Sequence, residues 1–544
     1  MKTLPIGAST LISIVDNHCY YVDKTPFVKQ LVDSGRYYFL SRPRRFGKSL
    51  FIDTLKQAFL GKQVYFKGLY LETRWDWHTH FPVIHISFGG GVLEDRHGLD
   101  IKIAEILKHH ANQHQIHLEF STISGQFAEL IEKLQQKYQQ KVVILIDEYD
   151  KPILDNLTNT PVALQMREGL KNLYSVIKDC DEWLKFVFLT GVSNFSKVSL
   201  FSGLNNLEDI SLIPDYALIC GYRESDIKAV FGDRLAGVDF ELLKRWYNGY
   251  HFLGESVYNP YDILLYLDSK QFKNYWFETA TPSFLLKLIQ EREYYLPQLE
   301  QLEVTEEILG SFDIEHLSLE TLLFQTGYLT IKKVDSFLEE RIFTLGYPNL
   351  EVKKSLNNYL LNYLIHDPAP KTRNQRAIYQ ALKNNELDSL KAIFQALFAS
   401  IPYNWYTKNP MNEYEGYYAS IFYCYLTALG LDLIGEDTTN KGRIDLTVKL
   451  EHKVFIIEFK VVDKNPDKAL SKKEEGKTTN TALQQIKDKR YYEKYLSTTP
   501  LTAFPPTPKG EIETEIYLIG VEFNPQERNI EHFDWEKWDD KLSG

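Results

Sequence analysis

Short apolar runs alternate with helix-length amphipathic segments over the first 225 residues of the chain. Four runs have the length of a buried strand, at residues 36–41, 81–87, 141–147 and 185–190. Apolar runs of about four to eight residues bounded by polar turns are typical of strands that helices cover on both faces. The pattern therefore predicts an α/β core built on one mostly parallel sheet.

The first run leads into a turn with the character of a phosphate-binding loop. Residues 40–49 are Leu-Ser-Arg-Pro-Arg-Arg-Phe-Gly-Lys-Ser, and a helical pattern follows. Backbone N–H groups at a helix N-terminus bind phosphate, Lys48 is expected to reach the outer phosphates, and the Ser49 hydroxyl is expected to bind Mg²⁺. In the pattern G-x-x-x-x-G-K-[ST], the first glycine falls on Arg42 when the second is Gly47. The turn must therefore open without a glycine.

The strand at 141–147 ends in two acids, as a Walker B motif does. Asp147 is expected to hold Mg²⁺ through water, and Glu148 to polarise the water that attacks the γ-phosphate. Thr190 ends the strand at 185–190, where a sensor residue would lie beside the γ-phosphate. The alternative is a plain α/β core in which Asp147 only caps a turn.

A second candidate site lies on two predicted strands at 442–450 and 453–460. Asp445 lies on the first strand, and alternation within the second puts Glu458 and Lys460 on one face. Two carboxylates and a backbone carbonyl between them form an oxygen ligand set for a divalent metal, while Lys460 orients or activates a water. This set suits phosphodiester hydrolysis. The alternative is that both acids are ordinary hairpin carboxylates.

Helical patterns on either side of this hairpin extend the candidate set. The upstream helix begins at Glu415, a further acidic metal ligand, and the downstream segment carries Gln485 and Tyr491. Basic and aromatic residues gather nearby, and such a mixture suits a phosphate backbone with bases stacked beside it. They are Lys464, Lys472, Lys473, Lys487, Lys489, Arg490, Tyr491 and Tyr492. A solvated amphipathic helix with i,i+4 charge pairs is the alternative.

Motifs in the first two thirds of the chain resemble those of a bacterial family of AAA-ATPase-like proteins. They are YYVDKT at 20–25, LSRPRRFGKS at 40–49, DEYD at 147–150, TGV at 190–192, LNNLED at 204–209, WYNGY at 246–250 and YNP at 258–260. In that family R-P-R-R-F-G-K-S is the usual loop. The resemblance implies a nucleotide site formed by Arg44, Arg45, Phe46, Gly47, Lys48, Ser49, Asp147 and Thr190.

The order of elements in the last part of the chain resembles the PD-(D/E)XK nuclease superfamily. A glutamate-bearing helix, an Asp strand, a Glu-x-Lys strand and a Gln-bearing helix follow one another. The resemblance implies that Asp445, Glu458 and Lys460 are catalytic, that Glu415 joins the two acids on the metal, and that Gln485 and Tyr491 complete the motif. A polar insertion at 461–480 lengthens the connection, and Ala419 stands where many relatives have histidine.

Composition limits the range of functions. The chain has 544 residues, too many for one core, and 62 Lys and Arg against 73 Asp and Glu give a formal net charge of -11. This acidity excludes a uniformly basic nucleic-acid coat, so contact with nucleic acid is expected to be local. The 4 cysteines are too few for a disulfide framework and are expected to be reduced core thiols. Without a signal peptide or a membrane-spanning apolar run, the protein is expected to be cytoplasmic with no membrane contact.

Together these patterns predict an α/β protein with a P-loop NTPase (AAA-like) core, a helical lid and connector, and a smaller α/β nuclease-like domain. The expected domains are a P-loop AAA-ATPase-like domain at 1–225, a helical lid at 226–345, a helical connector at 346–400 and a PD-(D/E)XK nuclease-like domain at 401–544.

The expected function is ATP binding and hydrolysis with Mg²⁺, coupled to a Mg²⁺-dependent nuclease for which Mn²⁺ is an alternative metal. DNA is the expected nucleic acid. A homo-oligomer is one alternative for the oligomeric state, which the sequence leaves open. In one rival reading, the last domain binds nucleic acid or protein without cutting, and the chain is a nucleotide-dependent switch. In another, hydrolysis is lost and ATP binding supports an assembly. The intact Asp445, Glu458 and Lys460 argue against the first rival, and the intact Glu148 argues against the second.

Overall fold

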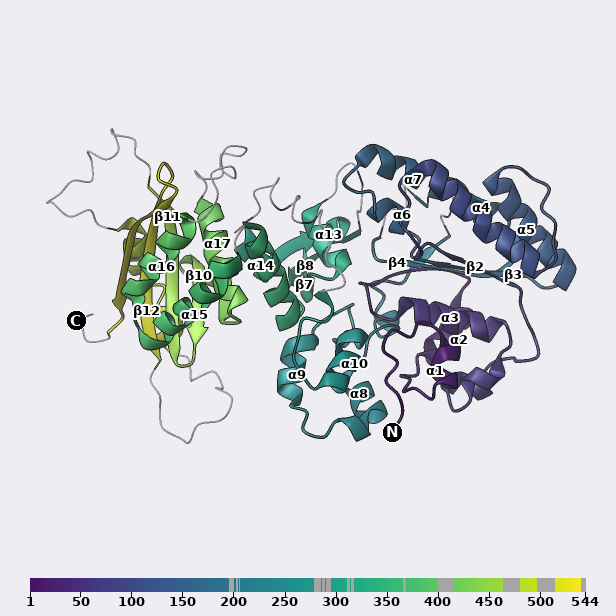
Figure 1. The fold of residues 1–544 in the computed structure, drawn as a ribbon, viewed down its shortest axis with the longest axis horizontal. Coiled ribbons are helices and arrows are strands. Elements are labelled where there is room, and N and C mark those ends of the chain that lie inside the picture. The colour runs from purple at the N-terminus through teal and green to yellow at the C-terminus, as the bar shows by residue number, and fades with distance from the viewer. Residues whose placement is uncertain are drawn as a thin grey trace. The chain divides into compact units, whose positions relative to one another are not determined.

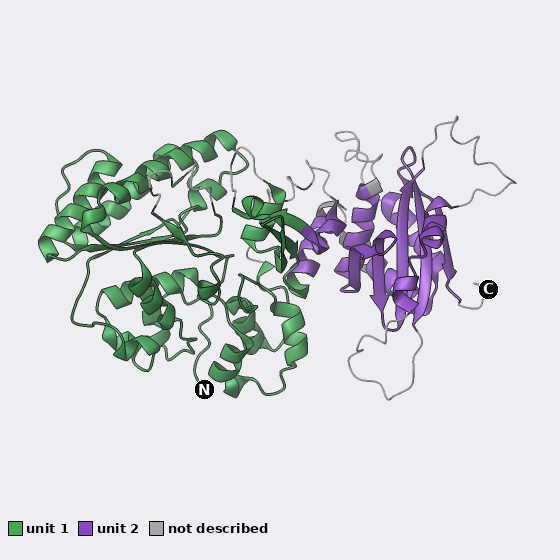
Figure 2. Cartoon of the chain, turned by 180° about the vertical axis from the view of Figure 1, so that it is seen from behind, with its two compact units in different colours: residues 1–284, 303–351 green, residues 285–302, 352–544 purple. Residues whose placement is uncertain are grey.

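The computed structural model divides the chain into two compact units, which Figure 2 colours separately. Unit 1 comprises residues 1–284 and 303–351, and unit 2 comprises residues 285–302 and 352–544. The structure describes residues 1–194, 200–201, 204, 206–277, 285, 289, 295–310, 314, 318–364, 368–399, 415–462, 480–496 and 514–539. The chain passes between the units more than once, because unit 2 takes a short segment from within unit 1.

A five-stranded parallel sheet forms the core of unit 1, in the order β2-β3-β4-β1-β5. Its strands are β1 (Tyr37–Ser41), β2 (Val83–Ser87), β3 (Val142–Asp147), β4 (Leu184–Gly191) and β5 (Glu208–Asp209). Every residue of β3 is buried, as a strand covered on both faces requires. The predicted α/β core with a parallel sheet is therefore confirmed.

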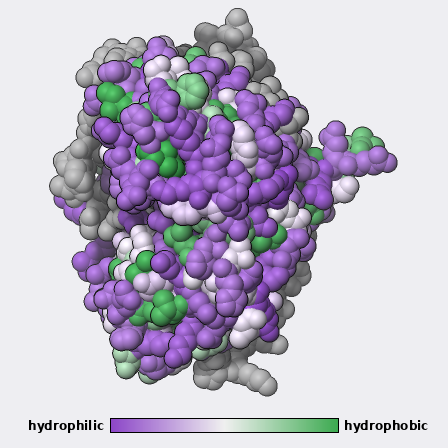
Figure 3. All heavy atoms as spheres, turned by 90° about the vertical axis from the view of Figure 1, so that its right-hand side faces the viewer, coloured by the Kyte–Doolittle hydropathy of each residue, from purple (hydrophilic) through white to green (hydrophobic). Residues whose placement is uncertain are grey.

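Helices cover both faces of this sheet, which Figure 1 shows nearly edge-on. On one side lie α1 (Leu11–Asp16), α2 (Thr25–Ser34) and α3 (Lys48–Phe59), and on the other lie α4 (Arg96–Gln113), α5 (Ile123–Tyr138), α6 (Lys151–Leu154) and α7 (Thr160–Asp179). The face at the right of Figure 1 is mainly hydrophilic, with scattered hydrophobic residues (Figure 3). The apolar sides of the helices therefore face the sheet, and their polar sides face solvent.

The remainder of unit 1 is helical with a small added sheet. Its elements are α8 (Glu224–Val230), α9 (Phe240–Tyr247), α10 (Pro260–Ser269), β6 (Leu302–Thr305), α12 (Glu306–Gly310), α13 (Leu319–Thr326), β7 (Thr330–Phe337) and β8 (Glu340–Gly346). The three strands pair in the order β6-β8-β7 and were not predicted. Six of the eight residues of β7 are exposed, so the ribbon lacks the apolar alternation that identifies a half-buried strand.

Unit 2 is built on a mixed sheet in the order β13-β12-β11-β10-β9. Its strands are β9 (Asp432–Thr439), β10 (Gly442–Leu450), β11 (Lys453–Val461), β12 (Glu515–Asn524) and β13 (Asn529–Lys537), and its helices are α14 (Leu350–Leu364), α15 (Pro368–Asn384), α16 (Leu387–Ala399), α17 (Glu415–Ala428), α19 (Thr481–Lys489) and α20 (Glu493–Leu496). β10 and β11 form the predicted antiparallel hairpin, and β12 runs parallel to β11.

Alternation along β11 decides which helix each residue meets. Phe459 contacts Phe422 of α17, whereas Glu458 contacts Gln485 of α19. α17 and α19 therefore cover opposite faces of the sheet. No helix in the part of the chain that the structure describes is long and apolar enough to cross a membrane.

Candidate nucleotide and nuclease sites

The phosphate loop joins β1 to α3 as the sequence predicts. Gly47 is the N-cap of α3 with φ +93°, and α3 begins at Lys48. A side chain at this φ is strained, so glycine is the residue that turns the chain into the helix here. Arg45, in the same loop, also has a positive φ of 68°, a backbone conformation that is strained for a residue with a side chain.

Arg42, which replaces the first glycine of the usual motif, anchors the loop from behind. Its side chain is only 1% exposed and donates to the carbonyl oxygens of Ser41 at 2.9 Å, Ser211 at 2.7 Å and Tyr216 at 3.2 Å. Its guanidinium carbon lies 3.9 Å from the ring centroid of Phe252. Burial lowers the pKa of Arg42 to about 10. The loop is therefore fixed by a buried cation and its carbonyl acceptors rather than by glycine flexibility.

Lys48 is held by the loop itself. Its Nζ donates to the carbonyl oxygens of Arg42 and Pro43, both at 2.9 Å. Burial lowers the pKa of Lys48, and the charge of Asp147 opposes that shift. The Lys48 ammonium group has three N–H donors, and its present acceptors are neutral carbonyl oxygens. It can exchange these carbonyl oxygens for charged phosphate oxygens, which bind an ammonium group more strongly.

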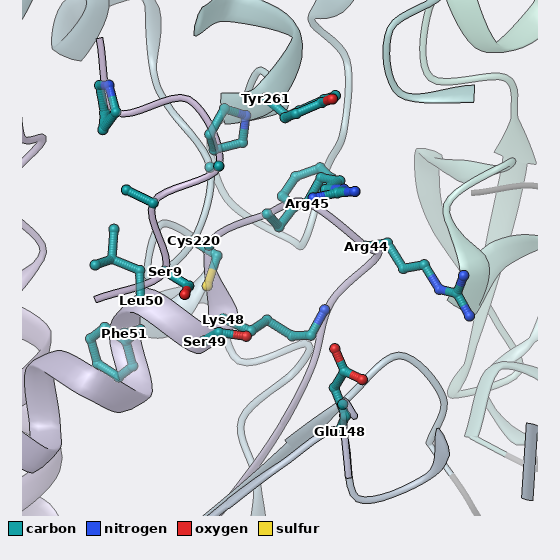
Figure 4. Close-up of a pocket in the computed structure, with 18 of the residues that line it drawn as sticks. Ser9, Arg44, Arg45, Lys48, Ser49, Leu50, Phe51, Glu148, Cys220 and Tyr261 are labelled. Carbon is teal, nitrogen blue, oxygen red and sulfur yellow. The ribbon is translucent and has the colours of Figure 1, made fainter. Parts of the chain in front are cut away.

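The two Walker B acids lie at the carboxyl end of β3. Asp147 is buried and pairs with Thr190 of β4 in the sheet register, and Thr190 in turn pairs with Leu40 of β1. Glu148 follows with φ 52°, a left-handed conformation that turns its side chain out of the strand. Figure 4 shows the Glu148 carboxylate facing the Lys48 ammonium. Burial, and then the charge of Asp147, raise the pKa of Glu148.

Thr190 lies where the sequence placed it, but its hydroxyl is engaged within the sheet. The hydroxyl donates to the carbonyl oxygen of Leu40 at 2.7 Å, and the side chain is fully buried. The polar groups that follow β4 are Ser193 and Asn194, which leave the sheet at its carboxyl edge. A hydroxyl that bridges two strands supports their spacing, and the side chains of Ser193 and Asn194 are also engaged, with Asp150 and Asp209 respectively.

A cavity of about 510 Å³ lies in front of the loop, a size typical of small-ligand sites. Phosphate-side residues in its lining include Arg44, Arg45, Phe46, Gly47, Lys48, Ser49 and Glu148. The opposite wall is formed by some of the residues in the ranges 5–9, 20–24, 219–222 and 260–264. It includes Tyr21 of the YYVDKT motif. The Arg45 guanidinium lies 4.9 Å from the ring centroid of Tyr261, while Arg44 points away from Lys48 (Figure 4). Asp147 and Thr190 lie outside this lining.

Asp150 is a functional candidate that the sequence reasoning did not single out. It lines the cavity, is only 1% exposed, and accepts from the backbone N–H groups of Val192 at 3.0 Å and Ser193 at 2.6 Å. Burial raises its pKa, and the hydrogen bonds from Ser193 oppose that shift. The signal available in the sequence was a third acid in the same turn, in the motif DEYD.

In unit 2 the hairpin brings the predicted acids together. The β10–β11 ladder ends at the Leu446–Ile457 pair, and one residue beyond it the Asp445 carboxylate accepts from the Phe459 N–H at 2.8 Å. Glu458 is only 1% exposed and accepts from the Gln485 amide. Burial raises the pKa of Tyr491, and the negative charges of Glu458 and Asp445 raise it further. The structure therefore gathers Asp445, Glu458, Gln485 and Tyr491.

Two glycines let α19 and Tyr491 approach the sheet closely enough for this gathering. A Cβ on Gly520 would lie 2.3 Å from the Leu483 backbone nitrogen, and a Cβ on Gly442 would lie 2.9 Å from the Tyr491 hydroxyl oxygen. Larger residues at either place would push α19 or Tyr491 outward. The position of Gln485 over Glu458 thus depends on Gly520.

Lys460 stands beside a further acid. In the parallel pairing of β11 with β12, Lys460 lies opposite Glu522, and Glu458 lies opposite Gly520. Glu522 is buried and accepts from the backbone and hydroxyl of Thr481, both at 2.6 Å. Lys460 and Glu458 therefore share a face of the sheet, as strand alternation predicts.

The donors fit a divalent cation in kind, since carboxylate oxygens are the ligands that Mg²⁺ and Mn²⁺ prefer. Glu415 begins α17 as predicted, but its side chain lies outside what the structure describes. Among the described residues, no three or more His, Cys, Asp or Glu side chains gather as a metal site. The pair Asp445 and Glu458 therefore needs water, a backbone oxygen or substrate oxygens to complete a coordination shell.

In the basic and aromatic cluster, the two tyrosines are buried, whereas Lys489 and Arg490 are exposed and Lys487 is partly exposed. Tyr491 and Tyr492 are buried, and the Tyr492 ring stacks on Trp538 with centroids 3.7 Å apart. Lys487 pairs with Glu536 at 2.6 Å, and Arg490 pairs with Glu493 at 3.3 Å. Base stacking on these two tyrosines is therefore excluded, because their rings are already packed. Lys464, Lys472 and Lys473 lie outside the described residues.

Comparison with known proteins finds a family match within each unit. Residues 5–201 match the family model described as predicted AAA-ATPase, and residues 413–533 match the PD-(D/E)XK nuclease superfamily. The chain belongs to the AAA-ATPase-like family and carries a C-terminal domain of the PD-(D/E)XK nuclease superfamily. A protein of Azotobacter chroococcum mcd 1, described as "Uncharacterized protein in vnfD 5'region", is 47% identical over 533 residues, which cover 98% of each chain.

Proposed function

We propose that unit 1 binds and hydrolyses ATP with Mg²⁺, and that unit 2 cleaves nucleic acid, with DNA as the first substrate to test. One observation carries the first half of this proposal. Lys48 and Glu148 face each other on the phosphate side of a cavity of about 510 Å³ at the carboxyl edge of a parallel sheet, where such sheets bind nucleotides.

Each residue then has a defined task in ATP turnover. Lys48 exchanges the carbonyl oxygens of Arg42 and Pro43 for phosphate oxygens, and the N–H groups at the start of α3 hold the same phosphates. Mg²⁺ would be held by Ser49 and Asp147 and would neutralise charge on the phosphates. Glu148 accepts a hydrogen bond from the attacking water and aligns it, for which its carboxylate must be ionised.

Replacing Glu148 tests the first half of the proposal. We expect Glu148→Gln to bind ATP with unchanged affinity and to lose turnover by about two to three orders of magnitude, because the amide orients water but accepts no proton. Titration with a fluorescent ATP analogue measures binding, and phosphate release measures turnover. Glu105→Gln, on the exposed side of α4, is the matched control. Turnover by Glu148→Gln at the rate of that control would assign the reaction to another group.

In unit 2, Asp445 and Glu458 would hold the metal, and Lys460 on the same face would stabilise the negative charge that forms on the attacked phosphate. The metal supplies Lewis acidity toward that phosphate. The experiment is a cleavage assay of wild-type protein on linear and circular double-stranded DNA, single-stranded DNA and RNA, with Mg²⁺ or Mn²⁺ and with or without ATP. Metal-dependent cleavage of any of these substrates supports the proposal.

A second function is favoured by the contacts of unit 2. Glu458 is bonded to Gln485, Asp445 to the Phe459 N–H, and the nearby tyrosines are packed. These contacts suit a domain that binds nucleic acid or protein without cutting and that the ATPase switches. Binding of labelled DNA that changes with ATP, with no cleavage under either metal, is the outcome expected of this switch. In both cases we propose that the protein acts in the bacterial cytoplasm.

A further inference from the structure

The turn that follows β4 is held in place from the Walker B side. Asp150 lies two residues beyond Glu148, and its Oδ2 atom accepts from the backbone of Val192 and from the backbone and hydroxyl of Ser193. Gly191 permits this approach, because a Cβ there would lie 2.4 Å from the Asp150 Oδ1 atom. The turn at 192–194 is therefore coupled to the acids that act on the nucleotide.

The same turn is held from the other side by α13. The Asn194 backbone N–H donates to the Gln325 Oε1 atom at 2.9 Å, and the Gln325 Nε2 atom donates to the Leu309 carbonyl at 3.1 Å. Gln325 is buried, so both ends of its amide are satisfied by backbone groups and its orientation is fixed. Leu309 belongs to α12, so a single side chain joins the turn, α12 and α13.

α13 also meets the phosphate loop. Gly327 ends the helix with φ +92°, and a Cβ there would lie 2.7 Å from the Pro43 Cβ atom. Pro43, Asn194 and Gln325 further line a small cavity of about 30 Å³, together with Arg42. One helix end therefore touches both elements expected to respond to the γ-phosphate, namely the loop and the turn after β4.

The course of the chain gives this helix a route to unit 2. α13 lies within the segment 303–351 of unit 1, which is preceded by residues 285–302 and followed by residues 352–544, both in unit 2. The backbone therefore connects the segment that contains α13 to unit 2 at both of its ends. No other segment of unit 1 is bounded by unit 2 on both sides.

We propose that Gln325 is a positioning residue for ATP turnover, which holds the turn at 192–194 beside the nucleotide, and that α13 thereby responds to nucleotide state. The proposal rests on ATP hydrolysis by unit 1. Phosphate binding transfers the Lys48 ammonium away from the Pro43 carbonyl, and Pro43 packs directly on Gly327 at the end of α13. Gln325 transmits the change to the turn through Asn194.

The first test compares two changes in α13 of the full chain. Gln325→Met keeps the length of the side chain and removes both amide hydrogen bonds. Thr326→Val is the control, because it removes a hydroxyl that bonds only within the helix, to the Leu322 carbonyl. We expect Gln325→Met to lower kcat about tenfold and to change the Kd for ATP less than about twofold, and Thr326→Val to resemble wild type. A misfolded fraction of a variant would lower the apparent kcat without changing the Kd, so kcat is calculated per ATP-binding site, whose concentration the binding titration measures.

The second measurement uses wild-type protein and so does not depend on how a variant folds. Hydrogen exchange is followed at the amides of 319–326 with saturating ATP and Mg²⁺, and the amides of α5 serve as the internal control. We expect nucleotide to slow exchange in α13 and to leave α5 unchanged. Equal exchange in α13 with and without bound nucleotide would overturn the proposal.

The outcomes separate this inference from the proposed function. If wild type turns over ATP and Gln325→Met does so at the rate of Thr326→Val, the inference is wrong and ATP hydrolysis stands. If wild type neither binds nor hydrolyses ATP, the proposed function is wrong and the inference falls with it.

Discussion

The two candidate sites differ in what their polar groups meet. In unit 1, Lys48 and Glu148 face a cavity large enough for a nucleotide, and Lys48 bonds only to neutral carbonyl oxygens of its own loop. In unit 2, Glu458 bonds to Gln485, and Asp445 bonds to a backbone N–H of the neighbouring strand. Phosphate in unit 1 replaces two bonds from the Lys48 ammonium to neutral carbonyl oxygens with stronger charge-assisted bonds, whereas a metal in unit 2 must compete for carboxylates that already accept hydrogen bonds.

The nature of the anchoring also differs between the sites. Unit 1 fixes its loop with a buried arginine that bonds to three carbonyl oxygens, whereas unit 2 fixes its acids with neutral donors. A buried arginine is costly to leave without partners, so its contacts define one loop conformation. We therefore expect the site in unit 1 to be more sensitive to changes in its supporting residues than the site in unit 2.

The largest expected effect is the loss of ATP binding in Lys48→Ala. Lys48 is the cation that the loop presents to the phosphates, and a charge-assisted bond to phosphate has no substitute there. We expect the Kd for ATP to rise by at least about two orders of magnitude, measured by titration calorimetry. Lys62→Ala, an exposed lysine beyond α3, should bind as wild type does. Tight binding by Lys48→Ala would remove the assignment of the phosphate loop.

The matching change in unit 2 is Asp445→Ala, which we expect to abolish cleavage and to leave ATP turnover within about twofold of wild type. Removal of one of two acids leaves too few oxygen ligands for a divalent metal. Gel-based cleavage and phosphate release are measured on the same preparation, with Glu527→Ala, at an exposed turn between β12 and β13, as the control. Equal cleavage by Asp445→Ala and wild type would place the activity elsewhere.

A smaller effect is expected from Arg42→Gly, which restores the glycine of the usual motif. The change removes three hydrogen bonds and the stacking on Phe252, so we expect the free energy of unfolding of unit 1 to fall by about 2 to 4 kcal/mol. Urea denaturation measures it. Arg44→Gly is the control, because it makes the same substitution two residues later at an exposed side chain of the same loop. Equal stability of the two variants would show that Arg42 does not anchor the loop.

The smallest expected effect is a shift in the pH dependence of ATP turnover. Burial raises the pKa of Glu148, and turnover requires its ionised form, so protonation on acidification begins at a higher pH than for an ordinary glutamate. We expect kcat to fall as the pH decreases, and the fall to occur at a higher pH than the protonation of an ordinary glutamate would give. A kcat profile at saturating ATP measures it. An acid limb at the ordinary glutamate pKa would argue against Glu148 as the group that titrates.

Local sequence determined the elements and the chemistry that each carries. The apolar runs became β1 to β4, the Gly-Lys-Ser turn began α3, and the Asp strand and Glu-x-Lys strand formed a hairpin. These features follow from short-range rules, namely the burial of apolar strands, the φ freedom of Gly47 and the alternation of side chains along β11. The position of Glu458 and Lys460 on one face needed nothing more.

The tertiary structure alone decided the partners of each polar group. The sequence contained no sign that Arg42 would bond to Ser211 and Tyr216, that the Thr190 hydroxyl would donate to the Leu40 carbonyl, or that Tyr492 would stack on Trp538. It also gave no sign that Gln325 would meet Asn194, which lies 131 residues away. Such contacts depend on how separate elements pack, and periodicity within a single element contains no information about the packing partner.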